Sequence, residues 1–156
     1  MELSQVPEAK TSMLIRKPVG QVFEAFADPS VTTEFWFTRS SGRLEAGKRV
    51  QWEWEMYGFS TDANVLALEV NKRILVEWGD ESGCTTIEWT FSPRNEHETY
   101  VTIANSGFQG DGDSVVAQAI DSTEGFAFVL AGAKAFLEHG VALNLVGDKF
   151  PDAHVQ

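Results

Sequence analysis

The sequence has 156 residues, enough for one domain with a substantial core, and its hydrophobic fraction of 43% and charged fraction of 22% are typical of a globular protein. Its formal net charge of −11 disfavours nucleic acid as a ligand, because the protein would repel a phosphate backbone. The N-terminus has no apolar signal region, and no apolar run approaches the roughly 20 residues that cross a bilayer, so we expect a cytoplasmic protein without membrane insertion.

The N-terminal part of the chain predicts one strand and two short helices. Residues 11–16 read as the strand, and Pro18 is well placed for the first turn of a helix. Apolar residues then recur at helical spacing until Asp28 and Pro29 stop the pattern. The second helix is expected over residues 31–37, which end in a run of aromatic side chains.

From Leu44 onward the apolar period changes to two, which is typical of half-buried strands. Successive strands are expected over residues 50–56, 65–70, 74–78 and 86–91, with a last strand that contains Val101 and Ile103. The register of residues 65–70 is ambiguous. Short turns join the strands, among them residues 80–83 and 92–98, so the sheet should be an antiparallel meander.

A long helix is expected after a polar loop at residues 107–112. Asp113 or Ser114 can serve as its N-cap, and an apolar stripe leads to Gly140 as its C-cap. The tail, residues 141–156, also contains apolar side chains. We therefore expect it to pack against the rest of the domain.

Within this long helix, Gly125 fits helical structure least well, since glycine disfavours a helix interior by about 1 kcal/mol relative to alanine. Asp121 precedes Glu124 by three residues, which resembles a capping box at a helix start. We therefore expect either a break near Ser122 or a close backbone approach by a neighbouring element at Gly125.

The residues predict no metal, cofactor or catalytic site. The histidines His97, His139 and His154 are scattered without metal-ligand spacing. The single cysteine, Cys84, has acidic sequence neighbours, which would keep its thiol unreactive. Asp111 begins a segment like the start of a calcium loop, but the twelfth position is not a glutamate. We therefore favour a noncatalytic protein.

Several motifs occur in an order that points to a known family. They are Pro18 to Phe26 before Asp28-Pro29, Phe35-Trp36, a glycine turn within residues 44–50, a turn into residues 71–78, and Gly125-Phe126. This order, over about residues 11–140, resembles the START-like superfamily and its branch named after the activator of heat-shock protein 90 ATPase. The chain has Gly47-Lys48 where the family usually has two glycines, and its turn into residues 71–78 lacks the usual proline.

The resemblance implies an α+β helix-grip fold. In such a fold a curved antiparallel sheet of about six or seven strands wraps around a long C-terminal helix, and two short helices follow the first strand. We expect residues 1–156 to form one such domain, with its core over about residues 11–140 and a C-terminal tail. The resemblance also implies a cavity between sheet and helix for an apolar or amphipathic small molecule, but no single reaction.

The tryptophans on the apolar stripes of the strands should lie buried on one concave face of the sheet, opposite the helix. Together with apolar residues of the helix they are the candidate cavity wall, which comprises Trp52, Trp54, Trp78, Trp89, Phe91, Phe126, Leu130 and Ala133. Ala133 is smaller than its neighbours on the helix stripe, which would leave room for a ligand. The alternative is that the same side chains fill the core.

The expected function is the binding of a small hydrophobic ligand, in transport, sensing or stress response. One alternative is a cyclase-type or hydrolase-type enzyme that uses the same cavity, and another is a co-chaperone that activates the ATPase of a second protein. The sequence is also compatible with a homodimer and with a protein partner.

Overall fold

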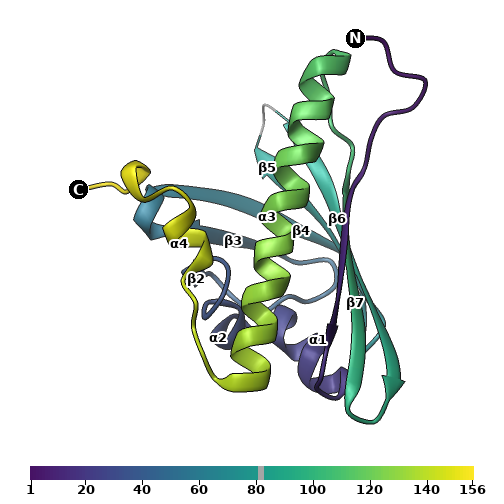
Figure 1. The fold of residues 1–156 in the computed structure, drawn as a ribbon, viewed down its shortest axis with the longest axis vertical. Coiled ribbons are helices and arrows are strands. Elements are labelled where there is room, and N and C mark those ends of the chain that lie inside the picture. The colour runs from purple at the N-terminus through teal and green to yellow at the C-terminus, as the bar shows by residue number, and fades with distance from the viewer. Residues whose placement is uncertain (81–82) are drawn as a thin grey trace.

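Seven antiparallel strands form one sheet in the described part of the chain, residues 1–80 and 83–156 of a computed structural model. The strands are β1 (Ala9–Ile15), β2 (Arg39–Ser40), β3 (Arg49–Trp54), β4 (Phe59–Glu69), β5 (Arg73–Asp80), β6 (Gly83–Asn95) and β7 (Glu98–Ser106). Their order is β1-β7-β6-β5-β4-β3-β2, so β2 to β7 form a meander and β1 joins it beside β7. The sheet curves around one long helix, α3 (Gly112–His139), which confirms the predicted α+β helix-grip fold (Figure 1).

Two short helices, α1 (Val19–Ala27) and α2 (Pro29–Thr32), follow β1 as predicted. Asp28 separates them, and its carboxylate accepts a hydrogen bond from the Ser30 N–H at 3.0 Å. The predicted extent of the second helix, residues 31–37, is wrong because α2 ends at Thr32. The aromatic residues 35–37 follow in a turn in which all of them are buried, whereas a helix would direct successive side chains to different sides.

The tryptophans of β3, β5 and β6 lie on the inner face of the sheet. Trp52 and Trp89 are each 1% exposed and Trp54 is 6% exposed, whereas Trp78 is half-buried and packs at the edge of the same core. The alternation therefore predicts the inner face correctly. Trp78 is less covered than expected because it borders a pocket, described below.

Local irregularities limit the predicted strand boundaries. After Trp54 the chain enters a 3-10 turn, η1 (Glu55–Tyr57), so β3 is shorter than predicted. A β-bulge between Val65 and Ala67 shifts the pairing of β4 with β5, which explains the ambiguous alternation there. β6 continues to Asn95, through part of the turn predicted at residues 92–98. Residues 81–82 of the other predicted turn lie outside the described residues.

The long helix α3 is continuous from Gly112 to His139, so the predicted break near Ser122 is wrong. Its N-cap is Asp111, rather than Asp113 or Ser114, because the Asp111 carboxylate accepts a hydrogen bond from the Ser114 N–H at 2.8 Å. Gly140 is the predicted C-cap, in left-handed geometry with a φ of 67°.

The alternative explanation for Gly125, a close backbone approach, is also wrong. A Cβ atom added there would meet none of the described atoms within 4 Å. The close approach occurs instead at Gly132, where an added Cβ would lie 3.1 Å from the Cβ of Phe35. Gly125 therefore borders open space, whereas Gly132 lies against Phe35.

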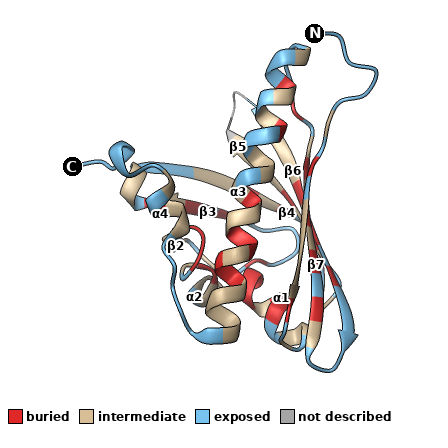
Figure 2. Cartoon of the chain, viewed as in Figure 1, coloured by how far each residue is buried: buried red, intermediate tan, exposed pale blue. Residues whose placement is uncertain are grey.

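Buried residues concentrate where the middle of α3 faces the sheet and α1 (Figure 2). After Gly140 the chain turns back along α3 and forms α4 (Leu145–Lys149) and η2 (Pro151–Ala153). Val146 of α4 packs against the core, which confirms that the tail packs. No helix in the described residues is long and apolar enough to span a membrane.

Candidate functional site

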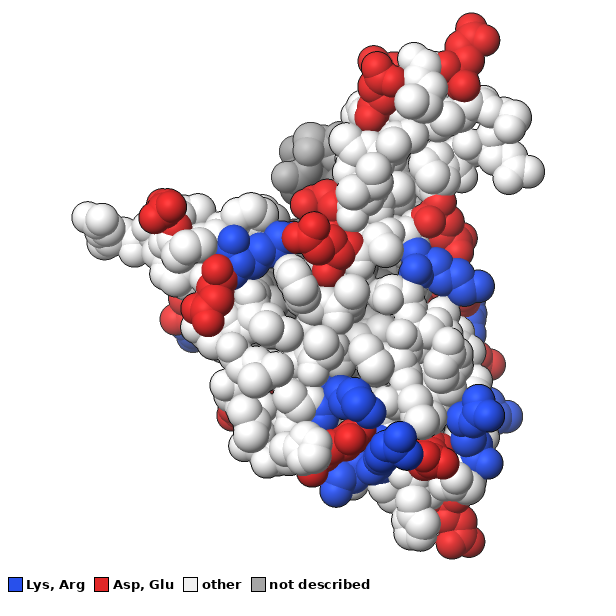
Figure 3. Space-filling view, viewed as in Figure 1, with Lys and Arg blue, Asp and Glu red and all other residues white. Residues whose placement is uncertain are grey.

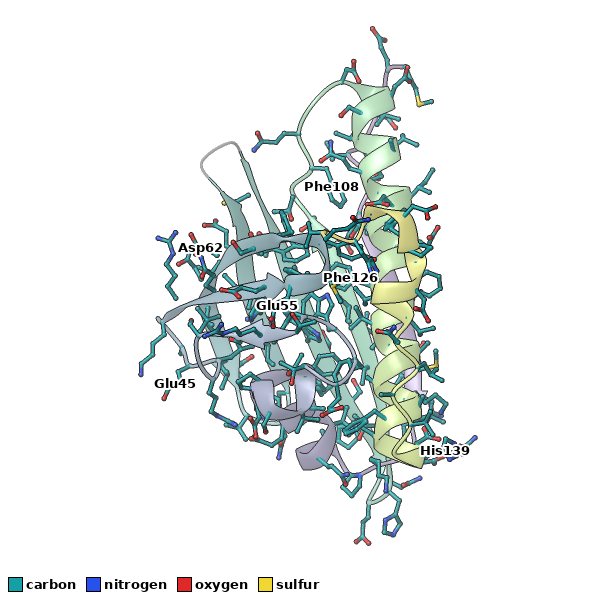
Figure 4. The ribbon with its side chains drawn as sticks, turned by 90° about the vertical axis from the view of Figure 1, so that its left-hand side faces the viewer. Glu45, Glu55, Asp62, Phe108, Phe126 and His139 are labelled. Atoms are coloured by element: carbon teal, nitrogen blue, oxygen red, sulfur yellow. The ribbon has the colours of Figure 1, made fainter. Side chains whose placement is uncertain are left out.

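A pocket of about 520 Å³ lies between the N-terminal half of α3, the sheet and the C-terminal segment, residues 141–156. Its wall comes from strands β3 to β7, from residues 118–129 of α3 and from residues 146–150. Phe126 lies on the side of α3 that faces the sheet, and Phe108 approaches from the loop before α3 (Figure 4). The pocket thus occupies the space between sheet and helix where the sequence resemblance implies a cavity.

Aromatic residues make up half of the residues that line the pocket. They are Trp36, Trp54, Tyr57, Phe59, Trp78, Phe108, Phe126, Phe128 and Phe150. Several hold one another in edge or tilted geometry: the ring centre of Phe126 lies 5.7 Å from that of Trp36 and 5.9 Å from that of Trp78. Such contacts between rings are favourable and orient them. This part of the wall is therefore a preformed apolar surface.

The structure brings only part of the predicted cavity wall to this pocket. Trp54, Trp78 and Phe126 line it. The other predicted residues are buried in the core outside its wall, namely Trp52, Trp89, Phe91, Leu130 and Ala133.

Trp36 explains why two of the predicted tryptophans do not reach the pocket. Its ring centre lies 4.9 Å from that of Trp52 and 6.0 Å from that of Trp89, so it stands between them and the pocket. The sequence prediction missed Trp36 because it lies outside the alternating strands. The run of aromatic residues at 35–37 was the available signal.

On α3, the free space lies beside Gly125 rather than Ala133. Ala133 and Leu130 are fully buried on later turns of the helix, where the core is packed. Gly125 lines the pocket and leaves a volume that a side chain would fill. A glycine inside a strong helix pattern was the signal in the sequence for this feature.

A buried polar network forms one side of the pocket. The Nδ2 of Asn105, a residue only 2% exposed, donates to the Thr86 carbonyl oxygen at 2.8 Å and to Thr85 Oγ1 at 2.9 Å. Its Oδ1 accepts a hydrogen bond from Ser122 Oγ at 2.8 Å. Trp78 Nε1 also donates to Thr85 Oγ1, at 2.9 Å. The network therefore joins β5, β6, β7 and α3 beside the aromatic wall.

The sequence prediction missed this network, although Asn105 carried a signal. In β7 it shares the inward register of Val101 and Ile103, and all of these residues are buried. A polar side chain at an otherwise apolar, inward position must be satisfied by hydrogen bonds. Such a position therefore indicates either a buried network or a ligand contact.

Charged side chains stand together at the rim of the pocket, where α4 meets α3 (Figure 3). Lys149 Nζ lies 3.0 Å from Glu124 Oε1 and 3.9 Å from Asp121 Oδ1. The same ammonium lies 5.6 Å and 5.1 Å from the ring centres of Phe128 and Phe150. Lys149 thus connects the C-terminal segment to α3 and shields two rings at the rim.

Further contacts hold the C-terminal segment over the pocket. Tyr57 Oη donates to the Val146 carbonyl oxygen at 2.5 Å, and the Val155 N–H donates to the Met56 carbonyl oxygen at 2.8 Å. His154 Nε2 lies 2.7 Å from the Gly147 carbonyl oxygen. The segment is therefore anchored to η1 and encloses one side of the pocket.

Other residues weighed in the sequence lie outside the pocket wall. His139 stands at the far end of α3 (Figure 4), and Asp111 caps the start of that helix. Cys84 lies in β6 opposite Gly79. In residues 1–80 and 83–156 the structure holds no cluster of three or more His, Cys, Asp or Glu residues that could bind a metal ion.

Comparisons with known proteins place the chain among relatives of similar fold. The family model described as "Activator of Hsp90 ATPase homolog 1-like protein" matches residues 16–135. The crystal structure of protein SSP2350 from Staphylococcus saprophyticus is 31% identical, with a TM-score of 0.74, over 88% of this chain and 96% of that one. No curated protein matches the chain significantly.

Two more distant solved structures share the fold. The Aha1 dimer from Colwellia psychrerythraea is 17% identical, with a TM-score of 0.74, over 86% of this chain and 98% of that one. CalU16 from Micromonospora echinospora is 14% identical, with a TM-score of 0.69, over 94% of this chain and 83% of that one.

Proposed function

The chain belongs to the family of Activator of Hsp90 ATPase homolog 1-like proteins, as its sequence motifs indicated, and we propose that it binds a small apolar or amphipathic molecule between α3 and the sheet. The observation that carries this proposal is the aromatic pocket of about 520 Å³. Ligand pockets of roughly 300–1,000 Å³ with mostly apolar walls and a few placed polar groups are typical of proteins that bind small molecules.

The surroundings of the pocket favour a ligand site over the alternative that its side chains only fill the core. A core that only needed to be filled would place a side chain at Gly125, because nothing described lies within 4 Å of an added Cβ. The chain instead retains a glycine there, at a cost of about 1 kcal/mol to the helix. The space beside it is enclosed by the anchored C-terminal segment.

The two alternatives use the same fold and can be separated from binding by experiment. An enzyme would convert the molecule that occupies the pocket, so mass spectrometry of the recovered ligand would detect a product. A co-chaperone, which the family description suggests, would instead act through a surface contact with a second protein. Binding in the pocket would then be absent or unrelated to that contact.

The test uses N-phenylnaphthylamine, an uncharged apolar probe, with tryptophan emission as the readout. Trp36, Trp54 and Trp78 border the pocket, so an occupant should quench or shift their emission. Gly125→Leu should weaken probe binding at least tenfold by filling the space, while far-ultraviolet circular dichroism stays unchanged. Ala117→Leu adds the same side chain at an exposed position of α3 and should bind like the parent.

The proposal fails if the parent protein shows no saturable change in emission with the probe. It also fails if Gly125→Leu binds the probe as tightly as Ala117→Leu does. If the pocket passes both tests, mass spectrometry of organic extracts from the purified protein identifies its natural occupant.

A further inference from the structure

The polar network beside the aromatic wall has a defined direction of hydrogen bonding. The Thr86 carbonyl oxygen can only accept, so the Asn105 nitrogen must face it and the Asn105 oxygen must face Ser122. Both N–H groups of that nitrogen are used, one by Thr86 and one by Thr85. The Asn105 oxygen therefore receives the proton of the Ser122 hydroxyl.

Matching donors with acceptors in the same way shows how the Thr85 hydroxyl is used. Its oxygen accepts from Trp78 Nε1 and from Asn105 Nδ2, both at 2.9 Å, and neither of those donors can accept in return. Both lone pairs of Thr85 Oγ1 are thus occupied and its proton is free to donate. Within the described part of the chain no hydrogen bond uses that proton.

Ser122 has the complementary capacity. Its proton goes to Asn105 Oδ1, which leaves the lone pairs of Ser122 Oγ as acceptors. Thr85, Asn105 and Ser122 all line the pocket, with the two hydroxyl groups on either side of the Asn105 amide. The pocket therefore presents one donor and one acceptor next to each other, beside the aromatic rings of its wall.

We infer that the ligand of the proposed pocket is an uncharged aromatic molecule with a hydroxyl group, and that Thr85 and Ser122 determine this specificity. This inference rests on the proposed binding function. The ligand oxygen accepts from the Thr85 hydroxyl, and the ligand proton is donated to Ser122 Oγ. A hydroxyl group is the smallest group that satisfies both, and the ring system of the ligand packs on Trp78 and Phe126.

The network disfavours an anion at the same place. A carboxylate or phosphate offers only acceptors and would face the lone pairs of Ser122 Oγ and Asn105 Oδ1, with a single free hydroxyl donor. The rim adds Asp121 and Glu124, whose negative charge exceeds that of the one ammonium near them. An uncharged hydroxyl group avoids both costs.

The test compares naphthol, methoxynaphthalene and naphthalene by isothermal titration calorimetry, with the oxygen of the first two at the same ring position. All three share the ring system, so binding of naphthalene tests the proposed function alone. Methoxynaphthalene can accept from Thr85, and naphthol can also donate to Ser122. We expect affinity to rise by about 3- to 10-fold at each step, as one hydrogen bond contributes.

Variants assign each step to its residue. Ser122→Ala should abolish the preference for naphthol over methoxynaphthalene and leave the preference for methoxynaphthalene over naphthalene. Thr85→Val should abolish the preference for methoxynaphthalene over naphthalene, and Thr85→Ser should restore that preference. Thr85→Val leaves two donors without an acceptor, so its folding is checked by circular dichroism, and Ser122→Ala carries the test if it unfolds.

The outcomes separate the two proposals. If the three ligands bind the parent protein with equal affinity, the inference about the hydroxyl group is overturned and the binding function stands. If the preferences exist but survive in Ser122→Ala and Thr85→Val, these residues do not determine them and the inference is again overturned. If none of the three binds, the proposed function and the inference both fail.

Discussion

Two glycines of α3 lie on the same helix in opposite surroundings. Gly125 borders the pocket, and Gly132 is in contact with Phe35. Gly125→Ala should raise the free energy of unfolding by about 0.5–1 kcal/mol, because alanine favours the helix and its methyl group meets no described atom. Gly132→Ala should lower it, because the added Cβ would lie 3.1 Å from the Cβ of Phe35.

Urea unfolding of both variants beside the parent protein measures these changes. Both substitutions replace glycine by alanine in the same helix. Opposite changes in the free energy of unfolding would therefore come from the different surroundings of the two positions. A stabilising Gly132→Ala would show that α3 moves away from Phe35 without loss.

Ala133 was expected to leave room for a ligand, but it is fully buried in the core. Ala133→Phe should therefore overpack the core and cost about 1–3 kcal/mol of stability or more. Its effect on probe binding should be small compared with that of Gly125→Leu. Thermal unfolding and the emission assay measure the two quantities on the same sample. Normal stability with weakened binding would instead extend the pocket to Ala133.

Single residues also show why the site was only partly predictable. The alternation of β3 and β5 gives the inward direction of Trp54 and Trp78, and the helix stripe gives that of Phe126. The spacing of apolar residues along the strands and the helix does not predict that Trp36 contacts Trp52 or that Ser122 contacts Asn105. These contacts depend on how the elements dock, which local periodicity does not contain.

At the scale of elements, the last turns of α3 are tied to β1. Glu138 Oε2 accepts from the Arg16 N–H at 2.9 Å and from Lys134 Nζ at 2.6 Å. Lys134 Nζ also donates to the Leu14 carbonyl oxygen at 2.7 Å. Burial alone would raise the pKa of Glu138, but the hydrogen bonds from Arg16 and Lys134 outweigh it and hold the pKa below its usual value.

This lowered pKa predicts a contribution to acid sensitivity. Because the folded state prefers the charged carboxylate, the contribution of Glu138 is fully present above its unfolded pKa, near 4.5. It is lost as the pH falls through the lower pKa of the folded state. Glu138→Gln should therefore be less stable than the parent at neutral pH, and the difference should shrink in acid.

Urea unfolding from neutral pH to about pH 3 measures this difference, since carboxyl groups titrate over that range. Glu96→Gln, which makes the same substitution at an exposed position between β6 and β7, is the control. A constant gap between parent and Glu138→Gln across the series would contradict the prediction.

Hydrogen bonds attach the C-terminal segment to η1, among them those from Tyr57 Oη to the Val146 carbonyl oxygen and from the Val155 N–H to the Met56 carbonyl oxygen. Tyr57→Phe removes the hydrogen bond to the Val146 carbonyl oxygen and keeps the ring in place, which should cost about 0.5–1.5 kcal/mol. The amide of Val155 should then exchange with solvent faster, because the segment opens more often. Hydrogen exchange by NMR measures this, with Tyr100→Phe in β7 as control. Equal exchange in both variants would show that Tyr57 does not anchor the segment.

At the scale of the whole molecule, the order of elements was predictable because each carries its own period. The alternating strands, the long helix stripe and Gly140 as a C-cap predict the elements and their order, whereas the helix-grip arrangement came from the resemblance to the START-like superfamily. The return of residues 141–156 over η1 was not predictable in the same way. It depends on long-range contacts such as that between Tyr57 and Val146, which are 89 positions apart.

The pairing of β1 with β7 has a consequence for how the chain is made. Ser12 and Thr102 share a hydrogen bond across 90 positions of sequence, and β1 has no strand neighbour other than β7 in the described sheet. A ribosome therefore releases β1 long before its partner exists, and the two must find each other across a large loop at an entropic cost. Closure of the sheet is thus a late event of synthesis, and high contact order of this kind slows folding. Until β7 emerges, the apolar side of β1 is available to chaperones and to other nascent chains.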